Sequence, residues 1–91
     1  MYQIRISNTF KKDTKKLKND PKAQSKLRAA INTLAAWDVL DPSYRDHALQ
    51  WDFVDHRECH IGPDTLLIYK IDHWELILVL VRYGSHSKLF G

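Results

Sequence analysis

The sequence predicts a single α+β domain in which one strand and two helices precede four further strands. Residues 2–6 alternate between apolar and polar side chains, as in a strand with one buried face. Residues 21–37 carry apolar side chains at helical spacing, and from residue 49 short apolar runs alternate with turn residues. We therefore expect a β-α-α-β-β-β-β order, with an antiparallel sheet and an N-terminal helical hairpin packed on one of its faces.

The expected helices are bounded by residues that start and stop helices. Ser7, followed by two more polar residues, offers an N-cap to a helix that carries Phe10 and Leu17 on one face. Asp20 and Pro21 end that helix and start the second, because proline at the first helical position has no amide hydrogen to lose. We expect the apolar stripe of the second helix to enter the core; it consists of Leu27, Ala30, Ile31, Leu34 and Trp37.

Four strands are expected in the second half of the chain. They span residues 49–54, 56–61, 65–71 and 75–81. The last two are almost continuously apolar, which is typical of central strands covered on both faces. Turns are expected at Gly62–Asp64 and at Asp72–His73.

Size and composition favour one compact domain over residues 1–91. The chain is 44% hydrophobic and 27% charged, as in an ordinary globular protein. Cys59 is the only cysteine, so no intrachain disulfide forms, and we expect a reducing, cytoplasmic location. The longest apolar run, Leu76–Val81, is too short to span a membrane, and the N-terminus does not read as a secretory signal.

Charge is divided unevenly along the chain. Residues 1–30 hold nine basic and two acidic side chains, a local net charge of +7, whereas the rest of the chain has a net charge of −4. A cationic face of this kind attracts phosphate backbones, although solvated lysines are also common on helix surfaces. We expect the first helix to contact RNA through four lysines, namely Lys11, Lys12, Lys15 and Lys16.

Four polar residues are expected to gather at one end of the sheet. If the last two strands pair symmetrically about residue 73, Asp64 lies opposite Arg82. His60 precedes the same turn as Asp64, and His86 follows Arg82 by four residues. His56 and His73 are interpreted as surface residues, because one lies within a strand and the other lies at the opposite turn.

This set suits the cleavage of RNA by transesterification. A base removes the proton of a ribose 2′-OH, a cation stabilises the charge on the phosphate, and an acid protonates the departing 5′ oxygen. Histidine titrates near neutral pH, and arginine stays charged and binds phosphate oxygens in pairs. A zinc site built from His60, Asp64 and His86 is the alternative, but Arg82 beside it would repel the cation. We expect no metal and no cofactor.

Three runs and the tail form a recognisable set in the second half of the chain, namely Asp46–Gln50, Arg57–Asp64, Leu66–Lys70 and Arg82–Gly91. With these residues the chain resembles the YafQ branch of the RelE-like toxins of type II toxin–antitoxin systems. The resemblance implies a RelE-like fold and a metal-independent endoribonuclease that cuts translated mRNA in the ribosomal decoding site. It also implies inhibition of translation, a cognate antitoxin that silences the toxin, and contact with operator DNA only through the antitoxin complex.

The resemblance also assigns site residues. The positions that match the family's functional set are His47, His60, Asp64, Arg82, His86 and Phe90. Phe90 either stacks on an RNA base or is a core residue that closes the sheet. Thr65 stands where relatives often carry tryptophan and Asp55 where they often carry glycine, so the cleavage preference does not transfer.

Two alternatives differ in class from a ribonuclease toxin. One is a non-catalytic nucleic-acid-binding module that uses the basic helices. The other is a toxin relative without activity that serves in a repressor complex with its antitoxin. A pure binder needs lysine and arginine but no clustered histidines, so the cluster favours the enzyme.

Overall fold

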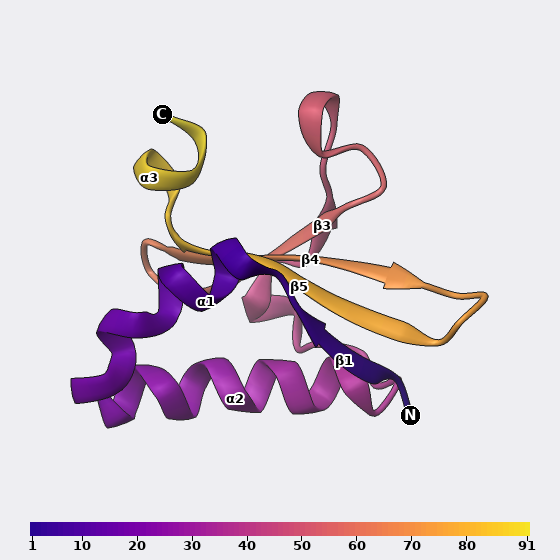
Figure 1. Cartoon of the computed structure of the whole chain (residues 1–91), viewed down its shortest axis with the longest axis horizontal. Helices are drawn as coiled ribbons and strands as arrows, with labels where there is room; N and C mark the ends of the chain where they lie inside the picture. The colour runs from indigo at the N-terminus through magenta and orange to yellow at the C-terminus, as the bar shows by residue number, and fades with distance from the viewer.

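The computed structural model describes the whole chain, except the side chain of Asp52. It is a mixed α+β fold with one five-stranded sheet (Figure 1). The elements, in chain order, are β1 (Gln3–Ile6), α1 (Asn8–Thr14), η1 (Lys15–Asn19), α2 (Pro21–Ala35), η2 (Pro42–Tyr44), β2 (His47–Ala48), η3 (Trp51–Phe53), β3 (Arg57–Gly62), β4 (Thr65–Asp72), β5 (Ile77–Ser85) and α3 (His86–Phe90), where η marks a short 3-10 helix. None of the described helices is both long and apolar enough to cross a bilayer.

The strand order in the sheet is β1-β5-β4-β3-β2. The last four strands pair antiparallel, but β1 pairs parallel to β5, with Gln3 opposite Ile77 and Ile6 opposite Leu80. The prediction of a purely antiparallel sheet is therefore wrong. Parallel pairing needs a long connection between the two strands, and most of the chain lies between β1 and β5.

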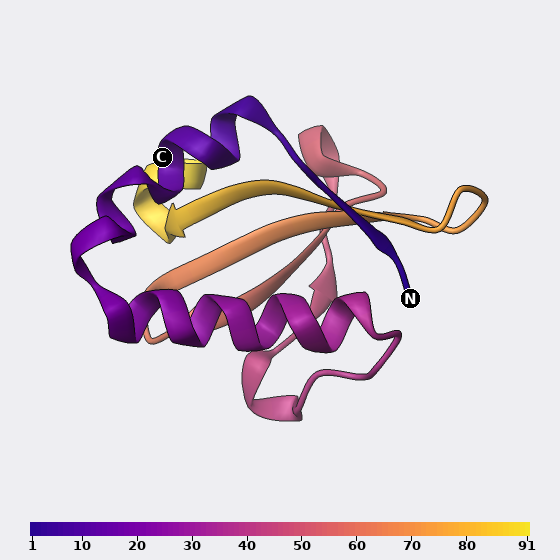
Figure 2. The same ribbon diagram turned by 60° about the horizontal axis from the view of Figure 1, so that its bottom comes forward.

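The main core lies between the sheet and α2, which runs along one face of it (Figure 2). Leu27, Ala30 and Leu34 of α2 are buried there against alternate residues of the strands. The strand residues on this face include Cys59, Ile61, Leu67, Tyr69, Leu78, Leu80 and Tyr83.

Both predicted helix starts are confirmed. The Ser7 hydroxyl accepts a hydrogen bond from the backbone N–H of Phe10 (3.0 Å), and the Asp20 carboxylate accepts one from the N–H of Ala23 (3.1 Å). The prediction that Trp37 enters the core is wrong. Helix α2 ends at Ala35, Trp37 adopts a positive φ of 65°, and its side chain is 58% exposed.

Two expectations about strands also need correction. All four residues of β1 are exposed, because it is an edge strand that α2 does not cover. No strand spans residues 49–54; β2 is only His47–Ala48, and a 3-10 turn follows it. Trp51 and Asp55 both have left-handed backbone angles, with φ of 61° and 68°, so this loop leaves the extended conformation.

The turn between β4 and β5 is longer than the sequence suggested. The Asp72 carboxylate accepts hydrogen bonds from the N–H groups of Trp74 and Glu75, both at 3.0 Å, and Leu76 has a φ of 57°. The strands therefore pair about a later centre. A bulge between Ile68 and Tyr69 shifts the pairing by one further residue, so that Arg82 lies opposite Ile68 instead of Asp64. A polar side chain that captures backbone N–H groups thus decides the register.

Cys59 is buried in the core, and burial raises the pKa of its thiol to about 12. A thiol with such a pKa is protonated at neutral pH and is a poor nucleophile. We expect no modification by iodoacetamide at pH 8 in the native protein and rapid modification in urea, as measured by mass spectrometry. Modification of the native protein at the rate of the unfolded chain would contradict the burial of Cys59.

Candidate functional site

The face of the sheet opposite α2 carries polar residues that the resemblance assigned to the site, among them His47, His60 and Arg82. Helix α3 and the loop that contains η3 rise from this face on either side of the strands (Figure 1). A small second apolar cluster lies beneath α3; it consists of Leu66, Ile68 and Leu89 with Leu49, Phe53 and Val81 packed against them. This cluster fixes α3 on the sheet.

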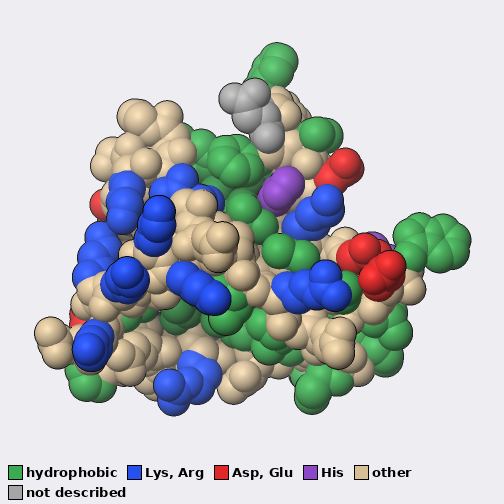
Figure 3. Space-filling view, viewed as in Figure 1, with side chains coloured by type: hydrophobic (Ala, Val, Ile, Leu, Met, Phe, Trp, Pro, Cys, Tyr) green, Lys and Arg blue, Asp and Glu red, His purple; other side chains and the backbone are tan. Residues whose placement is uncertain are grey.

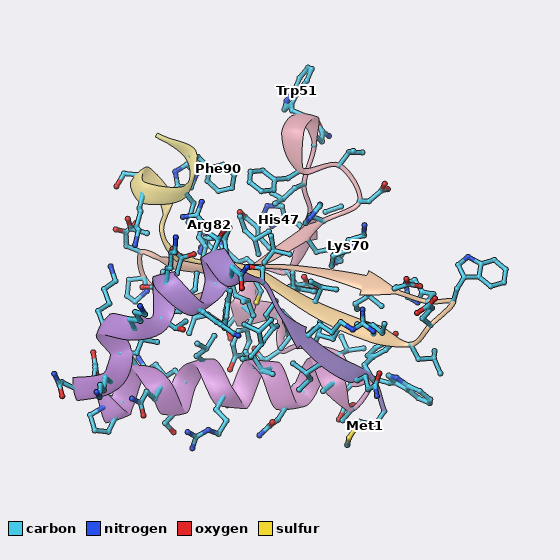
Figure 4. All side chains as sticks on the ribbon, in the orientation of Figure 1. Met1, His47, Trp51, Lys70, Arg82 and Phe90 are labelled. Atoms are coloured by element: carbon cyan, nitrogen blue, oxygen red, sulfur yellow. The ribbon has the colours of Figure 1, made fainter. Side chains whose placement is uncertain are left out.

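One row of paired residues crosses this face of the sheet. Arg82 on β5 pairs with Ile68 on β4, Ile68 pairs with Glu58 on β3, and Glu58 pairs with His47 on β2. Directly paired residues in a sheet project their side chains to the same side. The register therefore places Arg82, Glu58 and His47 on one surface, and Figure 4 shows His47 and Arg82 on it with Phe90 above.

His47 is held through both of its ring nitrogens. Nδ1 lies 2.7 Å from the carbonyl oxygen of Arg45, and Nε2 lies 3.0 Å from Oε1 of Glu58. A carbonyl oxygen only accepts, so Nδ1 carries a hydrogen and donates it. The Nε2–Glu58 contact then needs one further proton between the two side chains, which gives either a cationic His47 or a protonated Glu58. The other oxygen of Glu58 is buried and has no hydrogen-bond partner among the described residues.

Arg82 is held by Asp13, which comes from α1. Nε of Arg82 donates to Oδ2 of Asp13 at 2.8 Å, and a second guanidinium nitrogen donates to Oδ1 at 3.2 Å. The backbone N–H of Tyr83, which lies beyond the point where β1 stops pairing with β5, also donates to Asp13 (3.0 Å). Burial alone would raise the pKa of Asp13, but the hydrogen bonds from Arg82 and Tyr83 outweigh it and leave that pKa below its ordinary value.

Helix α3 presents His86 and Phe90 beside the η3 loop. The Ser85 hydroxyl caps α3 by accepting a hydrogen bond from the N–H of Lys88 (3.2 Å). The rings of His86 and Phe90 are 5.1 Å apart, and the Phe90 ring is 5.7 Å from Phe53. Phe53 in turn meets His56 at 5.7 Å. Phe90 keeps 38% of its surface exposed, so it packs and still offers a ring face to a ligand.

The other predicted site residues lie at the end of the sheet where β3 turns into β4. His60 pairs with Leu66 and, through it, shares a row with Gly84, two residues before His86. Asp64 is exposed in the turn and lines a cleft with Lys16, Thr65 and Ser85. His60, Asp64 and His86 thus lie at one end of the sheet. Arg82 lies two residues before Gly84 on β5, about 7 Å from this end along the strand.

The four lysines that were expected to contact RNA are exposed on α1 and η1, where Figure 3 shows many Lys and Arg side chains. We call the surface formed by Lys11, Lys12, Lys15 and Lys16 the basic face. Two residues of the site were missed in the sequence: Asp13 and Glu58. Asp13 lies three residues after Phe10 and four before Leu17, which puts it on their buried face, where a carboxylate needs a cation. Glu58 lies two residues before His60 on the same strand, so alternation alone puts both on one face.

The family model that describes a bacterial toxin of type II toxin–antitoxin systems, YafQ, matches residues 2–91. The chain belongs to the YafQ toxin family. The mRNA interferase toxin YafQ of Escherichia coli strain BL21 is 35% identical to it over 89 residues, which cover 97% of this chain and 95% of the relative.

Solved structures of relatives share the fold of this YafQ family member. A metal-bound toxin from Helicobacter pylori superposes with a TM-score of 0.90 at 43% identity, over 99% of this chain and 100% of the other. YafQ in the complex of E. coli DinJ and YafQ superposes with a TM-score of 0.86 at 34% identity, over 100% of both chains. The five-stranded α+β fold predicted from the sequence is thus that of the YafQ structures.

The H. pylori relative was crystallised with metal. Among the described residues of this chain, no three or more His, Cys, Asp or Glu side chains come together in a group that could hold a metal ion. His60, Asp64 and His86, which the sequence offered as an alternative zinc site, do not form such a group in this structure.

Proposed function

We propose that this chain is a ribosome-dependent endoribonuclease that cuts translated mRNA, inhibits translation and is silenced by a cognate antitoxin. The observation that supports the proposal is its similarity along nearly its whole length to toxins named mRNA interferase. The complex of E. coli YafQ with DinJ supports an antitoxin as the partner. Action on ribosomes places the protein in the cytoplasm, and contact with operator DNA would come through the antitoxin.

The proposed chemistry is a metal-independent transesterification. The 2′ oxygen of a ribose attacks the adjacent phosphorus, the bond from phosphorus to the 5′ oxygen breaks, and a 2′,3′-cyclic phosphate and a free 5′-OH result. One proton leaves the 2′-OH and another reaches the 5′ oxygen. His86, exposed at the start of α3, is the acid in this proposal. His60 is the base; its row of paired residues crosses β5 at Gly84, two residues from Arg82.

Arg82 and His47 supply positive charge in this proposal. Arg82 is aimed by Asp13 through two of its nitrogens, and its remaining N–H groups can address a phosphate. His47 contacts an acceptor on each side, which suits a cation that stabilises the charged phosphate better than a free base. Phe90 offers its exposed ring face for base stacking. Asp64 lies at the same end of the sheet and supports the protonated form of a histidine.

The basic face completes the proposal. Lys11, Lys12, Lys15 and Lys16 are exposed, and they suit attachment to the phosphate backbone of ribosomal RNA. Figure 3 shows this concentration of positive charge on the side of the molecule that carries α1.

The proposal is tested by cleavage of a defined mRNA on purified ribosomes. We expect cuts in mRNA that occupies the decoding site and few cuts in the same mRNA when it is free. Phenanthroline, which removes transition metals and spares magnesium, should leave the rate unchanged. The cut products should carry a cyclic phosphate, as measured by mass spectrometry.

Each outcome bears on a separate part of the proposal. The absence of cuts in any message, with ribosome binding retained, would contradict the enzyme and favour the non-catalytic binding module. Equal cleavage of free mRNA would contradict the dependence on ribosomes. Loss of cleavage with phenanthroline would contradict the metal-independent chemistry.

A further inference from the structure

His47 of the candidate site is carried by the shortest strand of the sheet. Strand β2 is two residues long, lies at the edge of the sheet and pairs with β3 alone. A pairing of two residues contributes little stability by itself. The chain also leaves the extended conformation on both sides of β2, because Arg45 and Trp51 have φ angles of 50° and 61°. Contacts beyond the pairing of β2 with β3 must therefore hold His47 in place.

These contacts come from Asp46, the residue before β2. Its Oδ1 accepts a hydrogen bond from the hydroxyl of Tyr69 on β4. The guanidinium of Arg57 on β3 donates to both carboxylate oxygens, from Nε to Oδ1 and from a terminal nitrogen to Oδ2, each at 3.3 Å. Tyr69 is paired with Arg57 and lies in the core against α2. The side chain of Asp46 is thus held on the face of the sheet opposite the candidate site.

The hydroxyl of Tyr69 makes the stronger of the two contacts. Tyr69 is 1% exposed, whereas the side chain of Arg57 is 42% exposed. A hydrogen bond from a buried hydroxyl to a carboxylate is strong, and an exposed ion pair contributes little. Burial and the hydrogen bond to Asp46 raise the pKa of Tyr69 above its ordinary value of 10.0, so the hydroxyl remains a donor at neutral pH.

Asp46 reaches His47 through the peptide unit that joins Arg45 to Asp46. The carbonyl of this unit is the acceptor for Nδ1 of His47, at 2.7 Å. Because a peptide unit is planar, contacts that restrain Asp46 also restrain the direction of this carbonyl. On the other side of the ring, Nε2 of His47 lies 3.0 Å from Oε1 of Glu58. The ring therefore lies between a carbonyl that Asp46 restrains and a carboxylate of β3.

We propose that Asp46 is a positioning residue of the candidate site, which orients His47 through the carbonyl of Arg45. Tyr69 and Arg57 hold it behind the sheet, and the effect appears on the opposite face, where His47 addresses the phosphate. The inference rests on the proposed function for the role of His47 as a cation. The side chain of His47 is half-exposed, so without these contacts its ring is free to adopt other rotamers.

Tyr69→Phe tests the contact by removal of the hydroxyl alone, since the ring stays in the core. Single-turnover cleavage of mRNA at saturating ribosome concentration should fall at least about tenfold, because displacement of a reacting group by about 1 Å lowers a rate by up to about 10². The affinity for ribosomes should not change. Tyr44→Phe is the matched control, since Tyr44 also packs against the core and is not a partner of Asp46. It should cleave at the wild-type rate.

Substitutions of Asp46 and Arg57 separate position from charge. Asp46→Asn keeps an oxygen that accepts from Tyr69 and loses the negative charge, so it should keep most of the cleavage activity. Asp46→Ala removes both contacts and should lose at least as much activity as Tyr69→Phe. The fold should survive this change, because the side chain of Asp46 is 28% exposed. Arg57→Ala should have little effect, since an exposed ion pair is weak.

NMR spectra of the histidine rings report on His47 without ribosomes. Proton–nitrogen correlation spectra show which ring nitrogens carry hydrogens and whether these are hydrogen-bonded. The ring signals of His47 should move toward those of an unrestrained histidine in Tyr69→Phe and Asp46→Ala, but not in Tyr44→Phe. His73, exposed in the turn before β5, should give the same signals in every variant. A loss of stability alone would lower the midpoint of urea unfolding and leave these signals of the folded protein unchanged.

Three results would overturn the inference. One is cleavage by Tyr69→Phe at the wild-type rate. Another is an equal loss in Asp46→Asn and Asp46→Ala, which would assign the effect to the charge. The third is slower cleavage with unchanged ring signals of His47, which would leave Tyr69 and Asp46 a structural role only. Ring signals that move as expected, in a protein whose wild type cuts no mRNA, would contradict the proposed function and not this inference.

Discussion

His86→Ala should reduce the rate of mRNA cleavage by about 10²–10⁴, because removal of a general acid has an effect of this size. His86 is exposed at the first position of α3, so its side chain can reach a leaving oxygen without rearrangement of the core. The change should spare the fold. Helix α3 keeps its Ser85 cap and its buried Leu89, and only the ring contact with Phe90 is lost.

The measurement is single-turnover cleavage of mRNA on programmed ribosomes, with ribosome binding measured separately. His73→Ala is the control, since His73 is exposed in the turn before β5 and His86 follows the end of that strand, about 30 Å away. We expect normal ribosome binding by both variants and normal cleavage by the control. Cleavage by His86→Ala at the wild-type rate would assign the acid to another residue.

The elements that were predicted correctly have strong local signals. Ser7 and Asp20 begin helices because their side chains accept hydrogen bonds from N–H groups three residues later, and this interaction lies within a few residues of sequence. The apolar runs of β4 and β5 identify central strands for a similar reason. Their side chains are buried on both faces, and the sequence shows this directly.

The errors concern interactions between distant parts of the chain. The register of β4 and β5 depends on the Asp72 carboxylate, which lengthens the turn, and on a bulge between Ile68 and Tyr69. Together they move Arg82 four residues from the position opposite Asp64. The parallel pairing of β1 has no local signature at all. Trp37 follows the helical spacing of α2, but the helix ends before it and its backbone turns left-handed.

The candidate site was predicted in part because its residues lie close together in sequence or in a recognisable tail. His60, Asp64 and His86 lie at one end of the sheet, as the hairpin argument required, although the argument used the wrong register. The carboxylate that holds Arg82 was harder to predict. Asp13 and Arg82 are 69 residues apart, and only the fold brings α1 against the end of β5.

Asp13→Ala should lower the free energy of unfolding by about 3 kcal/mol, because it breaks a mostly buried ion pair and leaves one partner without its acceptor. The guanidinium of Arg82 and the N–H of Tyr83 both lose the carboxylate. Urea unfolding followed by fluorescence measures the change, and Asp38→Ala, at an exposed position, is the control. We also expect slower cleavage, since Arg82 is no longer aimed.

The loss of stability caused by Asp13→Ala should become smaller as the pH falls. The pKa of Asp13 in the folded protein lies below its ordinary value of 3.8, so its contribution is fully present above about pH 4 and is lost as the pH falls through the lowered pKa. The wild type and Asp13→Ala should therefore converge in stability in acid. A double-mutant cycle with Arg82→Ala isolates the energy of the Asp13–Arg82 interaction. The N–H of Tyr83 loses its acceptor both in Asp13→Ala and in the double variant, so that this effect cancels in the cycle. Additive effects of the two substitutions would show that Asp13 stabilises the fold through Tyr83 and Lys88 and not through Arg82.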